Sequence, residues 1–91
     1  MNKKRDRLQV IRDILATINE RNGKIKPTHI LYKSNLSHQM MEEYLKELIE
    51  KDFIKEVKVK TSKTYIMTNK GVEYLSKYNL ITDFIQSFGL D

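Results

Sequence analysis

The sequence contains no cysteine and no tryptophan, and only one proline and three glycines among its 91 residues. The absence of cysteine excludes disulfides, thiolate zinc sites and cysteine nucleophiles. No apolar run approaches the length of a membrane span, and the chain opens with charged residues in place of an apolar signal segment. We therefore expect a cytoplasmic protein without a membrane partner. Its length predicts one domain over residues 1–91.

Basic residues outnumber acidic ones by 17 to 12, which gives a formal net charge of +5 at pH 7. A positive balance favours an anionic partner, nucleic acid above all. Residues 55–63 hold four lysines against one glutamate, and residues 3–7 hold four basic residues against one aspartate. The first segment indicates a DNA contact. The second is equally consistent with a DNA contact and with a solubilising tail.

The first half of the chain shows the signals of three helices. Apolar residues recur every three or four positions over residues 4–20, and Asn22-Gly23 follows as a stop signal. Pro27 suits the first turn of a second helix over residues 27–33. Ser34-Asn35 breaks that helix, and Ser37 is a good N-cap for a third over residues 38–51. Two short helices joined in this way are typical of a helix-turn-helix.

The second half predicts a hairpin and a last helix. Residues 53–59 are rich in β-branched side chains, residues 60–63 form a polar tip, and residues 64–67 return. Thr68 or Asn69 begins a helix that extends to about Phe88, where Gly89 stops it. The order predicts a mostly α, α+β fold: a winged helix-turn-helix of three helices and a two-stranded wing, followed by a C-terminal helix.

Particular segments carry a family resemblance over about residues 5–85. The segment Ile30–Ser37 resembles the joint between the two helices in archaeal winged helix-turn-helix predicted transcriptional regulators. Tyr44-Leu45, Leu48 and Phe53-Ile54 look like core positions of that family, and the segment Tyr65–Gly71 looks like its return strand and last-helix start. The family includes the ten-kilodalton Sulfolobus DNA-binding proteins, which pair through their last helix. Asp52 stands where this family often has glycine, and aspartate tolerates the left-handed conformation that such a turn uses.

Base reading is expected from the start of the third helix, whose first residues reach the major groove in such folds. Gln39 can pair with adenine, and Met40 can touch a thymine methyl group. Four glutamates later in the helix favour an ordinary solvated face instead. Lysines of the hairpin suit phosphate contacts, although they also protect a hairpin edge from aggregation. The predicted DNA-binding residues are Thr28, Lys33, Ser37, His38, Gln39, Met40, Lys46, Lys58, Lys60, Thr61, Ser62 and Lys63.

The last helix, residues 69–88, is predicted to pair two copies of the chain. Five apolar residues follow the alternating four-three spacing of a short coiled coil, and we expect them to form the interface of a homodimer. Val72 and Leu75 lie beside this stripe and are expected to dock on the core of their own domain. The alternative is that the whole stripe folds back on its own domain. The predicted interface residues are Tyr74, Tyr78, Ile81, Ile85 and Phe88.

The sequence shows no pattern of catalytic, cofactor-binding or metal-binding residues. His29 and His38 have no further His or Cys to complete a metal site, and the adjacent pair Ser37-His38 points apart on a helix. We expect no enzyme, no cofactor, no metal and no small-molecule ligand. The favoured function is a homodimeric, nucleoid-associated transcriptional regulator that binds double-stranded DNA. An architectural chromatin protein and a winged-helix module that binds proteins remain alternatives; the hairpin lysines argue against the second.

Overall fold

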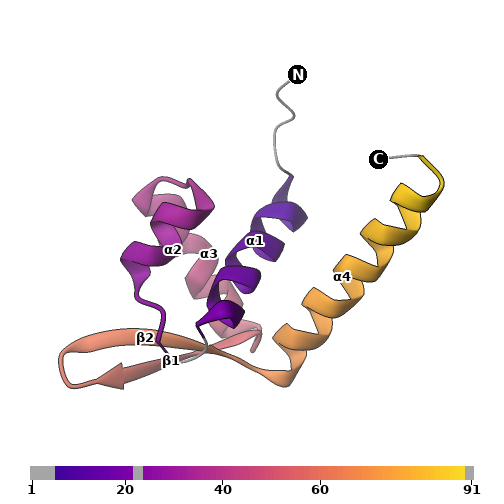
Figure 1. Ribbon diagram of the computed structural model, residues 1–91. Helices are drawn as coiled ribbons and strands as arrows, with labels where there is room; N and C mark the ends of the chain where they lie inside the picture. The colour runs from indigo at the N-terminus through magenta and orange to yellow at the C-terminus, as the bar shows by residue number, and fades with distance from the viewer. Residues whose placement is uncertain (1–5, 22–23, 90–91) are drawn as a thin grey trace.

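The computed structural model describes residues 6–21 and 24–89. Its elements follow in the predicted order: α1 (Arg7–Glu20), α2 (Pro27–Ser34), α3 (His38–Glu50), β1 (Ile54–Val59), β2 (Ser62–Met67) and α4 (Asn69–Ser87). Helices α1, α2 and α3 pack together above the antiparallel hairpin of β1 and β2 (Figure 1). The hairpin points to one side of this body. Helix α4 begins at the base of the hairpin and runs to the other side of this body (Figure 1).

Side-chain caps fix where three of the helices begin. The carboxylate of Asp6 accepts from the backbone N–H of Gln9 at 2.8 Å, and the Gln9 side chain accepts from the Asp6 N–H at 3.0 Å. This capping box starts α1 at Arg7, whereas the predicted start was residue 4. Residue 4 and the predicted stop signal Asn22-Gly23 lie outside the described residues. Ser37 caps α3, as the sequence predicted, and Thr68, one of the two predicted starting residues, caps α4.

Several predicted boundaries were wrong by one or two residues, and backbone conformation explains the differences. Helix α2 includes Ser34, whose hydroxyl donates to the Ile30 carbonyl at 2.5 Å, and it ends where Asn35 turns left-handed at φ 55°. Strand β1 begins one residue later than expected, at Ile54. Strand β2 begins at residue 62, so the hairpin tip contains only two residues, of which Lys60 is left-handed at φ 59°.

The core lies between the three helices and the inner face of the hairpin. Ile14, Leu15 and Ile18 of α1 are fully buried, as is Ile30 of α2. Burying such side chains stabilises the fold by about 1.5–3 kcal/mol each. The structure corrects one expectation here, because Val72 is 45% exposed and does not dock on the core, whereas Leu75 is buried as expected. The other buried apolar residues are Val10, Ile11, Ile25, Met41, Leu45, Leu48, Ile54, Tyr65, Met67 and Leu75.

The junction of α3, β1 and α4 depends on unusual backbone geometry. Asp52 adopts the left-handed conformation at φ 65°, as the family resemblance led us to expect. The Thr68 hydroxyl donates to the carbonyl oxygens of Asp52 and Phe53 at 2.6 and 2.9 Å. The start of α4 is thereby tied to the turn that precedes the hairpin. Among the described helices, none is both long enough and apolar enough to span a membrane.

Candidate nucleic-acid interface

The hairpin presents a cluster of lysines that its own fold does not neutralise. The strand register places Lys58 directly opposite Lys63, and Lys60 lies at the exposed tip between them. Within residues 6–21 and 24–89, none of these three ammonium groups forms an ion pair. Like charges directly opposite each other destabilise a strand pair. The arrangement is therefore better explained by an anionic partner than by the stability of the hairpin.

The first turn of α3 exposes three of the residues predicted to contact DNA. His38, Gln39 and Met40 all face solvent, just after the Ser37 cap. The positive end of a helix dipole at this place favours an anion. The Gln39 amide donates to the Glu43 carboxylate at 3.4 Å, a long contact between two exposed side chains. The geometry thus leaves the outer atoms of Gln39 available to a partner.

The remainder of α3 is acidic on its outer face. Glu42, Glu43 and Glu50 are exposed there, and Lys46 is the basic residue among them. Carboxylates repel phosphates, so this part of α3 is poorly suited to lie along a DNA backbone. The predicted phosphate contact of Lys46 consequently lies in an acidic neighbourhood. Only the first turn of α3 combines exposure with a favourable electrostatic field.

The fourth glutamate of α3 has an internal role. Glu47 accepts from the Arg7 guanidinium and from the Lys51 ammonium, the latter at 3.0 Å. The hydrogen bond from Arg7, followed by that from Lys51, lowers the pKa of Glu47 below its ordinary value. The Arg7 guanidinium also lies 5.8 Å from the centre of the Tyr44 ring. These contacts join the start of α1 to α3 and take Glu47 out of the candidate interface.

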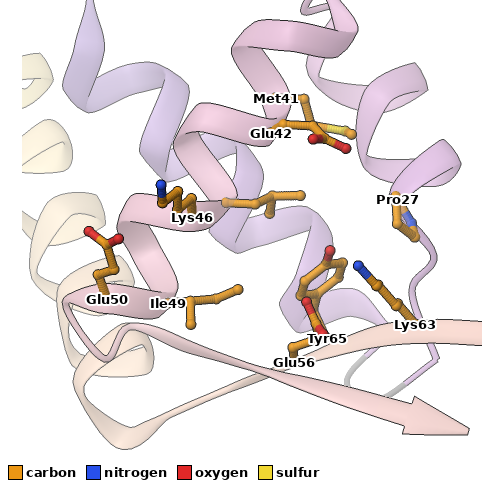
Figure 2. A pocket seen from close by; sticks show the side chains of 10 residues that line it. Pro27, Met41, Glu42, Lys46, Ile49, Glu50, Glu56, Lys63 and Tyr65 are labelled. Atoms are coloured by element: carbon orange, nitrogen blue, oxygen red, sulfur yellow. The ribbon is translucent and has the colours of Figure 1, made fainter.

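A cleft of about 270 Å³ lies between α3 and the hairpin (Figure 2). Its apolar lining comes from Pro27, Met41, Leu45, Ile49 and the Tyr65 ring. The Tyr65 hydroxyl and the Lys63 ammonium point into the space (Figure 2). Burial, followed by the charges of Glu56 and Glu42, raises the pKa of Tyr65. The charged residues of the lining are Glu42, Lys46, Glu50, Glu56 and Lys63.

A further basic surface surrounds α2, and only two of its residues, Thr28 and Lys33, were predicted to contact DNA. Thr28 and Lys33 are exposed on α2, as predicted, but so are His29 and Tyr32, the latter 89% exposed. The signal was present in the sequence, since no aspartate or glutamate occurs between residues 21 and 41. Lys24 and Lys26, just before α2, are exposed as well. The hairpin and α2 are therefore the basic parts of this side, and α3 is the acidic part.

The predicted dimer stripe on α4 divides into two parts. Tyr74 packs edge-on against Phe53 with ring centres 5.5 Å apart and stacks on Tyr78 at 6.2 Å, so both tyrosines are half-buried within their own chain. The distal half of the helix carries a continuous exposed apolar surface, which we call the α4 apolar face. Four of its residues are 61–66% exposed, and Ile85 is 38% exposed. The face consists of Leu80, Ile81, Phe84, Ile85 and Phe88.

Comparisons with known sequences agree with this architecture. A family model described as winged helix-turn-helix matches residues 4–86. An uncharacterised protein of Methanocaldococcus jannaschii is 34% identical over 74 residues, which cover 81% of this chain and 32% of that protein. The chain thus spans about a third of the length of this relative. The predicted family resemblance is confirmed.

Solved structures show the same fold. Sso10a-2, a DNA-binding protein from Sulfolobus solfataricus, superposes with a TM-score of 0.74 at 19% identity, covering 92% of this chain and 85% of that one. A mutant of S. aureus MepR bound to an oligodeoxyribonucleotide superposes with a TM-score of 0.76 at 13% identity, covering 87% and 60%. Identities this low establish a shared fold alone. The predicted winged helix-turn-helix fold is confirmed.

Proposed function

This chain belongs to the winged helix-turn-helix family, and we propose that it binds double-stranded DNA as a homodimer and regulates transcription. The observation that carries the proposal is the hairpin, where Lys58, Lys60 and Lys63 gather without an internal counter-charge. Phosphate oxygens supply that charge. Structures of the same fold include a DNA-binding protein and a MepR mutant bound to an oligodeoxyribonucleotide, which supports the same assignment.

The hairpin and α2 are basic and the outer face of α3 is acidic, and this distribution of charge suggests which elements contact phosphates and which contact bases. The hairpin lysines and the basic surface around α2 contact the sugar-phosphate backbone. Gln39 and Met40, in the first turn of α3, reach base edges in the major groove. The acidic outer face of α3 limits how closely the rest of that helix approaches phosphate. Most of the binding free energy is then electrostatic and comes from elements that flank α3.

A salt series tests DNA binding. Each phosphate contact that is lost flattens the slope of log K against log salt by about 0.9. The double variant Lys58→Gln, Lys63→Gln should therefore bind more weakly and with a flatter slope than wild type. The double variant Lys51→Gln, Lys77→Gln removes the same charge at the end of α3 and on α4, outside the lysine cluster of the hairpin, and should leave the slope unchanged. Equal slopes for all three proteins would remove the hairpin from the interface, and no binding by wild type would refute the proposal.

An architectural role, coating DNA with little sequence preference, is the second candidate. The acidic outer face of α3 favours it, because Glu42, Glu43 and Glu50 leave little of that helix to read bases. The two candidates differ in specificity. Affinity for genomic fragments that exceeds affinity for random fragments by about 10³ or more indicates a regulator, and similar affinities indicate an architectural protein.

The homodimer is proposed to form through the α4 apolar face, with α4 serving as a C-terminal dimerisation helix. A soluble protein rarely leaves so many large apolar side chains together on one exposed helix. Around a two-fold axis the same residues meet twice, so a charge near the middle of the face is doubly costly. Ile81→Glu should dissociate the dimer in sedimentation experiments at micromolar concentration, whereas Asn79→Glu, on a different side of α4, should not. A monomeric wild type would refute this interface.

A further inference from the structure

The cleft between α3 and the hairpin combines an apolar floor with charges of both signs at its rim. The floor is formed by buried side chains, among them Met41, Leu45 and the Tyr65 ring. Pockets for drug-sized ligands measure about 300–1,000 Å³. A cleft of about 270 Å³ is therefore suited to a smaller molecule with an apolar part.

The charges at the rim come from separate elements, and within the described residues only Glu42 has an ion-pair partner. Glu56 belongs to β1 and Lys63 to β2, and neither forms an ion pair within the described residues. Glu42, on α3, has only the exposed His38 at 3.7 Å. The rim thus offers carboxylates from α3 and from the hairpin, and an ammonium group from each of them, Lys46 and Lys63.

The two signs are not evenly distributed inside the cleft. The raised pKa of Tyr65 reflects the charges of Glu56 and Glu42 in addition to burial. The carboxylates of Glu56 and Glu42 therefore lie near enough to the Tyr65 hydroxyl to favour a cationic group beside it. The Lys63 side chain reaches into the same space from the hairpin side (Figure 2), and it favours an anionic group there. A ligand that uses both must carry both charges.

We propose that this cleft binds a small zwitterion with an apolar side chain, which is the chemistry of a free apolar amino acid. The ligand ammonium lies against Glu42 and Glu56, its carboxylate against Lys63, and its side chain on the apolar floor. Ion pairs at an open rim are partly solvated and contribute little each. A ligand of about ten heavy atoms held in this way is expected to bind with a Kd in about the millimolar range.

Binding in the cleft also bears on regulation, a consequence that rests on the proposed function. The walls of the cleft are α3 and the hairpin, the elements assigned to base and phosphate contacts. A ligand bound between α3 and the hairpin changes the free energy of the arrangement of these two elements that binds DNA. Linkage then requires DNA to change the affinity for the ligand by the same factor. This cleft would let the DNA-binding fold itself respond to a metabolite.

Ligand titrations of the ¹⁵N-labelled full chain without DNA test the site. L-leucine and L-phenylalanine should shift amide signals of α3 and the hairpin. Phenethylamine lacks the carboxylate, 3-phenylpropionate lacks the ammonium and glycine lacks the apolar side chain, so each should bind about fivefold more weakly. Equal binding of the amine alone or the acid alone would overturn the proposal, as would shifts confined to other elements. No shift with either amino acid at about ten times the expected Kd would overturn it too.

Single-residue variants test where the ligand binds, and their amide spectra show whether each variant is folded. Glu56→Gln and Lys63→Gln should each weaken L-phenylalanine binding by about fivefold or more. Glu73→Gln removes an exposed carboxylate on α4, away from the cleft, and should leave binding unchanged. Wild-type-like amide spectra of the free variants establish that they are folded. Because no DNA is present, a failure here is distinct from a failure to bind DNA, and unchanged affinity in both cleft variants would overturn the assignment.

Discussion

Replacing Gly71 with alanine tests how the direction of α4 is fixed. Gly71 lies in the first turn of α4, and a Cβ atom there would fall well inside van der Waals contact of the Phe53 carbonyl oxygen. It would also lie 3.2 Å from the end of the Met67 side chain. The methionine can move, but the carbonyl belongs to the backbone of the turn before β1. Alanine therefore forces the start of α4 away from that turn.

The expected cost follows from what this movement disturbs. Phe53 accepts hydrogen bonds from the Thr68 N–H at 3.1 Å and from the Thr68 hydroxyl at 2.9 Å. Weakening both costs about 1 kcal/mol each, and overpacking costs about 1–3 kcal/mol. Alanine regains about 1 kcal/mol through its helix propensity. We expect a net loss of about 2–4 kcal/mol in the free energy of unfolding, a large share of the roughly 5–15 kcal/mol of a small domain.

Urea denaturation followed by circular dichroism measures this loss, with all variants at one protein concentration because dimerisation contributes to apparent stability. Ser76→Ala, at an exposed position of the same helix, is the matched control and should be neutral or slightly stabilising. A Gly71→Ala protein as stable as wild type would show that α4 tilts freely, and the argument from the Phe53 carbonyl would be refuted.

Three further expectations concern single residues. Gln39→Ala should weaken binding to a preferred DNA site by about 1–3 kcal/mol, with little effect on random DNA, in fluorescence anisotropy; an equal loss on both would make Gln39 a backbone contact. The hydrogen bond from Arg7, followed by that from Lys51, lowers the pKa of Glu47 in the folded protein below its ordinary value of 4.5. The stabilising contribution of the Glu47 carboxylate is therefore present above pH 4.5 and is lost as the pH falls further. Stability should therefore decline less on acidification in Glu47→Gln than in wild type, and parallel pH profiles from urea denaturation would contradict this. Asp52→Gly should raise the free energy of unfolding by up to about 1 kcal/mol, because glycine adopts φ 65° without a Cβ penalty; a lower urea midpoint would show that the Asp52 side chain stabilises the turn.

The local elements of this fold were predictable because their signals are local. Apolar residues at helical spacing identified α1, α2 and α3, and short polar side chains identified the caps at Ser37 and Thr68. The lysine-rich hairpin was also evident, although β2 proved two residues longer at the tip. The missed cap was Asp6, whose partner Gln9 completes a capping box that the sequence analysis did not consider.

The candidate site was predictable in part. Exposure of the predicted residues in the first turn of α3 and on the hairpin agrees with the sequence analysis, and their contacts with DNA stay predictions. The basic surface around α2 was missed, although the absence of acids over residues 21–41 was visible in the sequence. No sequence pattern indicated the cleft, because its walls come from elements that are distant along the chain.

What the sequence by itself determined is therefore the type and order of the elements, since periodicity, caps and turn residues act over a few positions. Only the tertiary structure decided which apolar residues are covered, because burial depends on the direction in which each element leaves its neighbour. Gly71 illustrates this: its close approach to the Phe53 carbonyl sends α4 away from the body of the fold. Leu75, near the start of this helix, is buried, while Val72 and Phe84 on the same helix remain exposed.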